Sequence, residues 1–217
     1  MNHSVLVIAV VSYLLGSIPF GYLLVRIFRG EDVRQTGSGN IGATNVARTG
    51  SKWLAIATLV LDALKGYVAV AHVFFFAGHH PGHLPQFGSH TVYILAALAG
   101  FCAIVGHMFP VWLRFQGGKG VATSVGAFLG IAPTAILVSL TAFVAIVAIT
   151  RYISLGSIVG AAVFPVAAWW LNPETRDGTV MACIVASALL IIIRHKDNIR
   201  RLRAGNENRF GGRKGGA

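Results

Sequence analysis

Long apolar runs constrain this chain more than any other feature of its sequence. Six stretches are mostly apolar, over residues 4–28, 53–77, 91–109, 133–150, 153–171 and 179–193. A bilayer core of about 30 Å is crossed by about 20 apolar residues as a helix, and each crossing segment must satisfy its own backbone. Only 12% of the residues are charged, which is low for a soluble domain. The sequence therefore predicts an all-α, polytopic transmembrane protein, with one domain over residues 1–217.

The basic residues set the expected topology. Sixteen of the 18 Lys and Arg residues fall in four segments: around the first polar loop, after the third apolar run, at Arg151, and in the tail from Arg194. Loops rich in Lys and Arg stay in the cytoplasm. If all four segments share that side, an even number of helices must separate each segment from the next.

The stretch 121–131 decides the number of helices. It is apolar but only about 16 Å long as a helix, and Gly130 and Pro133 predict a break at its end. One crossing over 121–150 would place Lys119 on the side opposite to the tail, so we expect two crossings. The prediction is seven spans with a short fourth helix, the N-terminus outside and the C-terminus cytoplasmic.

Several features carry little functional weight. The net charge of +11 would by itself allow nucleic-acid binding, but its placement beside apolar runs favours a membrane protein and no nucleic acid. The first run lacks a basic flank and a cleavage site, which indicates a retained span. Cys102 and Cys183 lie in apolar runs and are expected to be small buried hydrophobes. His79, His80 and His83 are expected to form an ordinary outer loop, not a metal site.

The first polar segment, GSGNIGATNVAR over residues 37–48, has the composition of a phosphate-binding loop. Glycines let the backbone turn its N–H groups toward a ligand, and Arg48 adds a planar cation suited to phosphate. The absence of a carboxylate favours phosphate over a metal or a sugar. A flexible, turn-rich surface loop is the alternative. The other residues expected to take part are Gly37, Ser38, Gly39, Asn40, Gly42, Thr44 and Asn45.

The second polar segment places Gly117, Gly118 and Gly120 around Lys119, directly before the predicted helix at residue 121. The free N–H groups at a helix N-terminus attract anions. The segment is not a P-loop, because Lys119 is followed by glycine. An interfacial turn with a lysine that reaches to water is the alternative. His107, just upstream, is expected to be structural.

Two further groups of residues have open interpretations. A basic flank that attracts anionic lipid explains the arginines of the tail, but not His195 and Asn198, which lie one helical turn apart on one face. Asp62 and Lys65 lie three residues apart inside the second apolar run. Charges inside a membrane are functional candidates, and a mutually neutralising structural pair is an equal alternative.

Four motifs together resemble the bacterial acyl-phosphate-dependent glycerol-3-phosphate acyltransferases, an integral membrane family. The match covers nearly the whole chain, with GSGNIGATNVAR (37–48), GHMFPVWLRFQGGKGVAT (106–123), RYISL (151–155) and RHKDNIRRLRAGNENRF (194–210). The H-x4-D pair of common glycerolipid acyltransferases is absent from the sequence, as are a nucleophile elbow and an Asp-rich metal motif. The resemblance implies seven membrane helices with these segments in the cytoplasm.

The resemblance also implies a reaction. Acyl phosphate gives its acyl group to the 1-hydroxyl of sn-glycerol 3-phosphate, producing lysophosphatidic acid and inorganic phosphate, the first committed step of bacterial phospholipid synthesis. The expected place is the bacterial plasma (inner) membrane, with no cofactor, no metal and no obligate protein partner. By motif, the functional positions are Ser38, Arg48, Lys119, Ser154, His195 and Asn198. The first segment is expected to hold acyl phosphate, and the others glycerol 3-phosphate. Gln116 departs from the family's frequent lysine.

The proton acceptor and the function class each keep an alternative. His195 and a phosphate oxygen of the donor are both candidates for the base, and we favour the phosphate because Arg194, Lys196 and Arg200 crowd the histidine. A membrane transporter of a small phosphate-bearing anion is the alternative function. It would need its binding groups near the midplane, whereas here they are expected on one side. A lipid-binding scaffold explains the tail alone.

Overall fold

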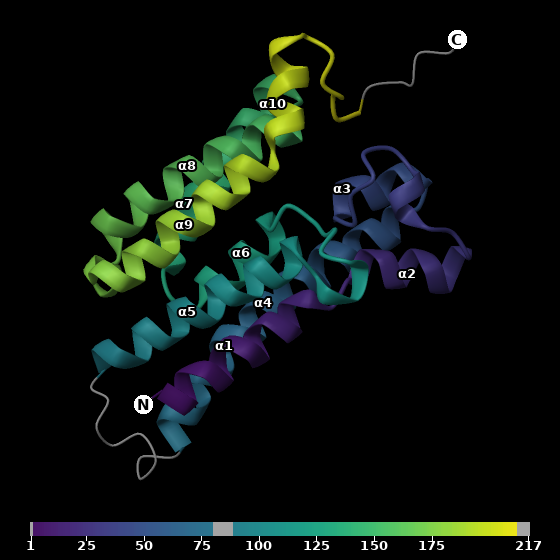
Figure 1. Ribbon diagram of the computed structural model, residues 1–217. Coiled ribbons are helices and arrows are strands. Elements are labelled where there is room, and N and C mark those ends of the chain that lie inside the picture. Colours follow the sequence, from purple (N-terminus) through teal and green to yellow (C-terminus); the bar gives the residue numbers. More distant parts are fainter. Residues whose placement is uncertain (1, 80–88, 212–217) are drawn as a thin grey trace, which may run out of the picture.

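Helices make up all the regular structure in the part of the chain that the computed structural model describes, residues 2–79 and 89–211. The long helices run alongside one another (Figure 1). The α-helices in these ranges are α1 (Asn2–Ser17), α2 (Phe20–Arg29), α3 (Ala43–Val46), α4 (Lys52–His79), α5 (Ser89–Met108), α6 (Val121–Leu129), α7 (Pro133–Thr150), α8 (Ile153–Leu171), α9 (Gly178–Arg194) and α10 (Lys196–Arg203). Short 3₁₀ helices occupy Val33–Gln35, Ala47–Thr49, Val111–Leu113 and Pro173–Arg176.

The long helices fit a bilayer by length and by surface. Within residues 2–79 and 89–211, five segments are long and apolar enough to cross a membrane, and α9 with α10, bent by 53°, makes a sixth candidate. Large apolar side chains point outward, with Leu137 62%, Trp170 71% and Ile149 80% exposed. Helices that are apolar all round belong in a protein core or in lipid. The all-α prediction is confirmed, and α7 and α8 have the predicted bounds of 133–150 and 153–171.

The short helix predicted before the fifth span is present. α6 begins at Val121, as predicted, and ends at Leu129, two residues before the predicted end. Its nine residues extend over about 13 Å, less than half of a bilayer core of about 30 Å. The count of seven crossings and the orientation of the termini remain predictions.

The first apolar run forms one candidate span, His3–Arg29, as predicted, but its helix is interrupted. A continuous run over 4–28 was expected, but α1 ends at Ser17 and α2 begins at Phe20. The cause is Pro19, which has no N–H to donate and disfavours the helical conformation in the residue before it, Ile18. The break leaves the backbone of Ile18 outside both helices.

Glycines let two pairs of helices pack backbone against backbone. A Cβ at Gly16 in α1 would lie 2.1 Å from the carbonyl oxygen of Ala103 in α5, and a Cβ at Gly66 in α4 would lie 2.1 Å from that of Thr123 in α6. Small residues allow this close approach between membrane helices. α6 is thereby fixed against α4, which gives the loop before α6 a defined place.

The basic segments lie at the same end of the helices. In Figure 1, α3 and α10 lie at the end opposite to the start of α1. The Arg194 guanidinium donates to the carbonyl oxygens of Gly117 and Gly118, and the N–H of Phe210 donates to the carbonyl of Arg151 over 2.7 Å. Segments that are distant in the sequence therefore form one polar face.

Candidate active site

The loop over residues 37–48, the first-motif loop, is organised around the buried side chain of Asn45. Its Nδ2 donates to the carbonyl oxygens of Val33 (2.9 Å), Thr36 (2.9 Å) and Asn40 (2.8 Å). Its Oδ1 accepts from the N–H of Ser38 over 2.9 Å and from the hydroxyl of Ser38 over 3.2 Å. One amide therefore holds the loop closed and leaves Ser38 at the surface.

Two glycines and an arginine shape the exposed side of this loop. Gly37 has φ +59° and Gly39 has φ +68°, a region that residues with a Cβ rarely adopt. A Cβ at Gly37 would also lie 2.7 Å from Cδ of Arg48. The half-buried Arg48 side chain thus lies directly over Gly37, the residue that precedes Ser38. A glycine is required here both for conformation and for room.

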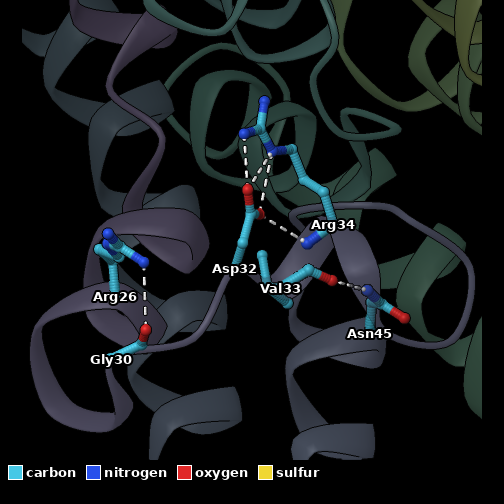
Figure 2. A network of polar contacts seen from close by, with 6 residues as sticks. All are labelled: Arg26, Gly30, Asp32, Val33, Arg34 and Asn45. Atoms are coloured by element: carbon cyan, nitrogen blue, oxygen red, sulfur yellow. Dashed lines mark hydrogen bonds and ion pairs between the residues drawn. The ribbon is translucent and has the colours of Figure 1, made fainter.

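The segment that leads into the loop is fixed by its own polar contacts (Figure 2). The carboxylate of Asp32 accepts from the backbone N–H of Arg34 over 3.0 Å and pairs with its guanidinium at 2.6 Å. The hydrogen bond from the Arg34 side chain lowers the pKa of Asp32. In Figure 2 the carbonyl of Val33 points to Asn45. The charge of Arg34 is therefore satisfied locally before the first-motif loop begins.

A second loop, residues 117–120, is held by backbone hydrogen bonds to α5 and by the Arg194 side chain at the end of α9. The N–H of Gly117 donates to the carbonyl of Met108, and the N–H of Gly118 to that of His107. The Arg194 guanidinium donates to the carbonyl oxygens of Gly117 over 3.1 Å and of Gly118 over 3.2 Å. This lysine-bearing loop presents Lys119 beside the tail.

Gln116 lies outside that contact set. It is exposed and lines a separate cleft of about 360 Å³. The cleft's lining residues are Tyr22, Arg34, Trp112, Leu113, Arg114 and Gln116, without Lys119. A neutral side chain at this position therefore leaves the immediate contacts of Lys119 unchanged.

A third group of residues gathers around the carboxylate of Glu207. Its Oε1 accepts from the hydroxyl of Ser154 over 2.9 Å and from Nδ2 of Asn198 over 2.6 Å. Its Oε2 accepts from Nε of Arg201 over 2.7 Å. The Nζ of Lys119 donates to Oδ1 of Asn198. These five residues, the Glu207 cluster, join α8, α10, the tail and the lysine-bearing loop.

The Glu207 carboxylate is held in its charged form. Burial raises the pKa of Glu207, but hydrogen bonds from Asn198, Arg201 and Ser154 outweigh burial, and the pKa is lowered. The carboxylate then keeps the amide of Asn198 turned so that its oxygen faces Lys119. The tail thus orients the lysine through Asn198.

Positive charge exceeds negative charge around Lys119. Burial lowers the pKa of Lys119 to about 8, the charge of Glu207 raises it, and the charges of Arg201, Arg48 and Arg194 lower it further. Three cations and one carboxylate therefore act on the lysine. A bound anion would relieve this repulsion and favour the protonated lysine. Arg48 acts on Lys119 from the first-motif loop, so the two regions belong to one electrostatic site.

His195 lies buried where α9 meets α10, with 2% of its surface exposed. Its Nδ1 lies 2.7 Å from the carbonyl oxygen of Ile191. Since a carbonyl only accepts, Nδ1 carries the hydrogen and Nε2 keeps the lone pair. Burial and then the charge of Lys119 lower the pKa of His195 to about 4. The imidazole is therefore neutral at neutral pH and a weak proton acceptor.

Comparison with known proteins places this arrangement in a family. Residues 6–205 match the family of glycerol-3-phosphate acyltransferases. The chain belongs to that family. It is 48% identical to the glycerol-3-phosphate acyltransferase of Allorhizobium ampelinum, over 93% of this chain and 90% of the relative, and 48% identical to that of Rhodopseudomonas palustris, over 94% and 95%. The relative from Geobacter sulfurreducens is 44% identical over 94% and 97%.

Two solved structures share the fold. Both are of PlsY, described as an integral membrane glycerol 3-phosphate acyltransferase, one in its glycerol 3-phosphate form and one in its lysophosphatidic acid form. The TM-scores are 0.83 and 0.80, with 34% and 32% identity over 96% of each chain. The resemblance drawn from the four motifs is confirmed, and with it the all-helical membrane fold.

The structure brings three of the site candidates of this family member into one hydrogen-bonded group. Lys119, Asn198 and Ser154 lie within the Glu207 cluster, and Arg48 acts on it through its charge. Gly120 has φ +82° and caps the N-terminus of α6. Asn40 accepts from the N–H of Gly42 over 2.9 Å at the start of α3, next to the exposed Thr44. The roles of all these residues toward a ligand remain predictions.

Sequence reasoning missed Glu207, Arg201 and the role of Arg194. The carboxylate of Glu207 contacts Ser154 from 53 positions away, so no local pattern reports the contact. One signal was available, since Glu207 is an acidic residue in a strongly basic tail. His80 and His83 lie outside the described residues. The described residues contain no group of three or more His, Cys, Asp or Glu that could hold a metal.

Proposed function

We propose that this chain transfers an acyl group from acyl phosphate to the 1-hydroxyl of sn-glycerol 3-phosphate, giving lysophosphatidic acid and inorganic phosphate. Relatives about half identical to it are named for glycerol-3-phosphate acylation, and the solved neighbours are the glycerol 3-phosphate and lysophosphatidic acid forms of one enzyme. The observation that carries the proposal is the excess of cations around Lys119, reached from the first-motif loop and the tail.

The donor needs only modest chemical help. Acyl phosphate is a mixed anhydride, so the substrate hydroxyl can attack the acyl carbon directly. The new ester C–O bond forms, the bond between the acyl carbon and the bridging oxygen of the phosphate breaks, and phosphate leaves with the bonding pair. The protein then has to hold two anions that repel each other and to stabilise the charge on the acyl oxygen. Arg48 and Lys119 supply the cations for the first task.

We assign the two substrates to two regions. The first-motif loop, with Ser38 and Arg48 at its surface, holds the phosphate of the donor. Lys119 and its neighbours hold glycerol 3-phosphate. An ammonium group has three donors, and Asn198 takes one of those of Lys119, which leaves two for a substrate phosphate. Asn45, whose amide is occupied within the loop, shapes this site instead of binding the ligand.

The proton from the hydroxyl passes to the donor phosphate in this scheme. His195 is the alternative acceptor, but its pKa of about 4 makes it a weak base. Its Nδ1 is engaged with the Ile191 carbonyl. A departing phosphate dianion is the stronger base and lies next to the hydroxyl in any productive arrangement. His195 then contributes a neutral contact to glycerol 3-phosphate.

The same geometry supports a proposal for the membrane setting. We propose that the polar end of the helices faces the cytoplasm of a bacterial inner membrane, where glycerol 3-phosphate is soluble and Lys- and Arg-rich loops remain. The acyl tail of the donor stays in the lipid. A transporter would need its anion groups near the midplane, but the Glu207 cluster lies at the helix ends, which favours the enzyme.

The test is an assay of purified protein with acyl phosphate and glycerol 3-phosphate, without acyl-CoA and with a metal chelator present. Mass spectrometry should detect lysophosphatidic acid in equal amount to the released phosphate. Acyl-CoA in place of acyl phosphate should give no product. Lys119→Ala provides the matched control, with activity expected to fall by roughly 100-fold. Product formation with acyl-CoA alone, or phosphate release at background, would contradict the proposal.

A further inference from the structure

Three ionisable side chains lie buried between α4 and α5 and have no part in the proposed chemistry. Asp62 and Lys65 in α4 are 2% and 4% exposed, and His107 in α5 is 3% exposed. The Nζ of Lys65 lies 2.8 Å from Oδ1 of Asp62, and Nδ1 of His107 lies 3.4 Å from the same oxygen. Charges within a membrane span are costly and are retained for a reason. The contacts on either side of this trio indicate the reason.

On one side, Lys65 reaches the break between α1 and α2. Its Nζ donates to the carbonyl oxygen of Ile18 over 2.7 Å, and it lies 5.7 Å from the ring centroid of Phe20. Ile18 precedes Pro19 and lies between the end of α1 and the start of α2. The lysine therefore ties α4 to the irregular turn that leads into α2.

On the other side, His107 backs the lysine-bearing loop. A Cβ at Gly118 would lie 1.8 Å from Nε2 of His107, so the loop rests directly on the imidazole ring. The N–H of Gly118 also donates to the carbonyl of His107 over 3.0 Å. Lys119 is the next residue. The position of the ring thus bears directly on the position of the lysine.

We propose that Asp62, Lys65 and His107 are positioning residues that hold the lysine-bearing loop, and so Lys119, in place. The Asp62 carboxylate faces one edge of the imidazole at 3.4 Å, the other edge supports Gly118, and Lys65 neutralises Asp62 while fixing the α1–α2 break. If His107 or its neighbours are replaced, the lysine-bearing loop loses this support and shifts. Lys119 then leaves its half-buried position beside Asn198. The alternative is a pair that only neutralises itself, with no effect on Lys119.

The experiment measures the reactivity of Lys119 itself. Trace acetylation with acetic anhydride across a pH series, read by mass spectrometry, gives the midpoint at which this amine becomes reactive, expected at about 8 in the native protein. In His107→Ala, which keeps the Asp62–Lys65 pair, the midpoint should rise by about one pH unit because Lys119 becomes more hydrated. The KM for glycerol 3-phosphate should rise about tenfold, with a smaller change in kcat.

A second variant guards against loss of folding. Asp62→Asn with Lys65→Met removes both charges together and leaves no lone buried ion, and it should move the midpoint in the same direction. Thr58→Ala is the matched control, since Thr58 is buried in α4 and bonds only its own helix at Leu54. Its midpoint should equal that of the native protein.

The outcomes separate this proposal from the proposed function. If His107→Ala and the double variant fold, as judged by size-exclusion profile and melting temperature, and both keep the native midpoint, the positioning role is wrong. The KM measurement rests on the proposed function, but the labelling does not. A shifted midpoint in a protein that lacks acyl-phosphate activity would support the positioning role and overturn the function instead.

Discussion

The first-motif loop and the Glu207 cluster both belong to the candidate site, but they are built in different ways. In the loop, Asn45 bonds to groups 5 to 12 positions away, and all its partners are neutral. In the cluster, Lys119 reaches Asn198 across 79 positions and Ser154 reaches Glu207 across 53. The loop is a local construction of neutral hydrogen bonds. The cluster is a long-range construction of charges.

This difference predicts how each region responds to change. Neutral hydrogen bonds are independent of the charge state of nearby groups, so the loop should fail only when a side chain is removed. The Glu207 cluster depends on the protonation of Lys119, whose pKa of about 8 lies close to neutrality. The loop should therefore supply a fixed shape, and the cluster an adjustable charge.

The largest effect is expected for Lys119→Ala. The change removes the cation that Asn198 orients, and a lost charged contact to a phosphate costs about 3 kcal/mol, or roughly 100-fold in kcat/KM. Steady-state assay with glycerol 3-phosphate checks the value. Lys119→Arg keeps the charge and should lose less. Near-native activity of the alanine variant would remove Lys119 from the site.

A smaller loss is expected for Asn45→Ala in the loop. Three loop carbonyls and the N–H of Ser38 lose their partner, at a cost of about 2–4 kcal/mol for buried groups left unpaired. We expect a lower melting temperature and about 30-fold lower kcat/KM. Asn45→Asp keeps the acceptor for Ser38, so its melting temperature and kcat/KM should lie between those of the native protein and those of Asn45→Ala. A stable variant with native activity would show that the loop is held by something else.

The pH dependence should come from the cluster and not from the loop. Because burial lowers the pKa of Lys119 to about 8, the lysine loses its proton as the pH rises through that value. At pH 9 about one lysine in ten stays charged, so kcat/KM should fall about tenfold from its value at pH 7. Lys119→Arg stays charged and should remove this decline, whereas Asn45→Asp should retain it. An equal decline in Lys119→Arg would assign the titration to another group.

The smallest effect is expected for Asn40→Ala. Its side chain accepts from the N–H of Gly42 over 2.9 Å, and a single partly exposed hydrogen bond contributes about 1 kcal/mol. Activity should fall about fivefold or less, with little change in melting temperature. A loss as large as that of Lys119→Ala would indicate that Asn40 binds substrate directly.

The sequence predicts the regular parts of the fold well. The bounds of α7 and α8 and the start of α6 at Val121 follow from apolar runs that end at charged or glycine-containing turns. The break at Pro19 was missed because its flanks are apolar, so composition outweighed the backbone restriction of proline.

The site is predicted less completely than the fold. Residue types indicate which groups can bind phosphate, and on that basis the sequence predicts Arg48 and Lys119 as site residues. They do not report which groups are already occupied inside the protein. The inward amide of Asn45 and the contact of Glu207 with Asn198 depend on chain folding. The link from His107 to Gly118 depends on helix packing.

A double-mutant cycle between Arg48→Ala and Lys119→Ala tests most directly whether the two regions act as one site. kcat/KM for the acyl-phosphate reaction is measured for the native protein, both single variants and the double variant. The effects of residues that act on one reaction as a unit are not additive. The loss of transition-state stabilisation in the double variant should therefore differ from the sum of the losses in the two single variants by about 1 kcal/mol or more. Losses that add within about 0.5 kcal/mol would mean that the first-motif loop and the Glu207 cluster work independently, and would contradict the account.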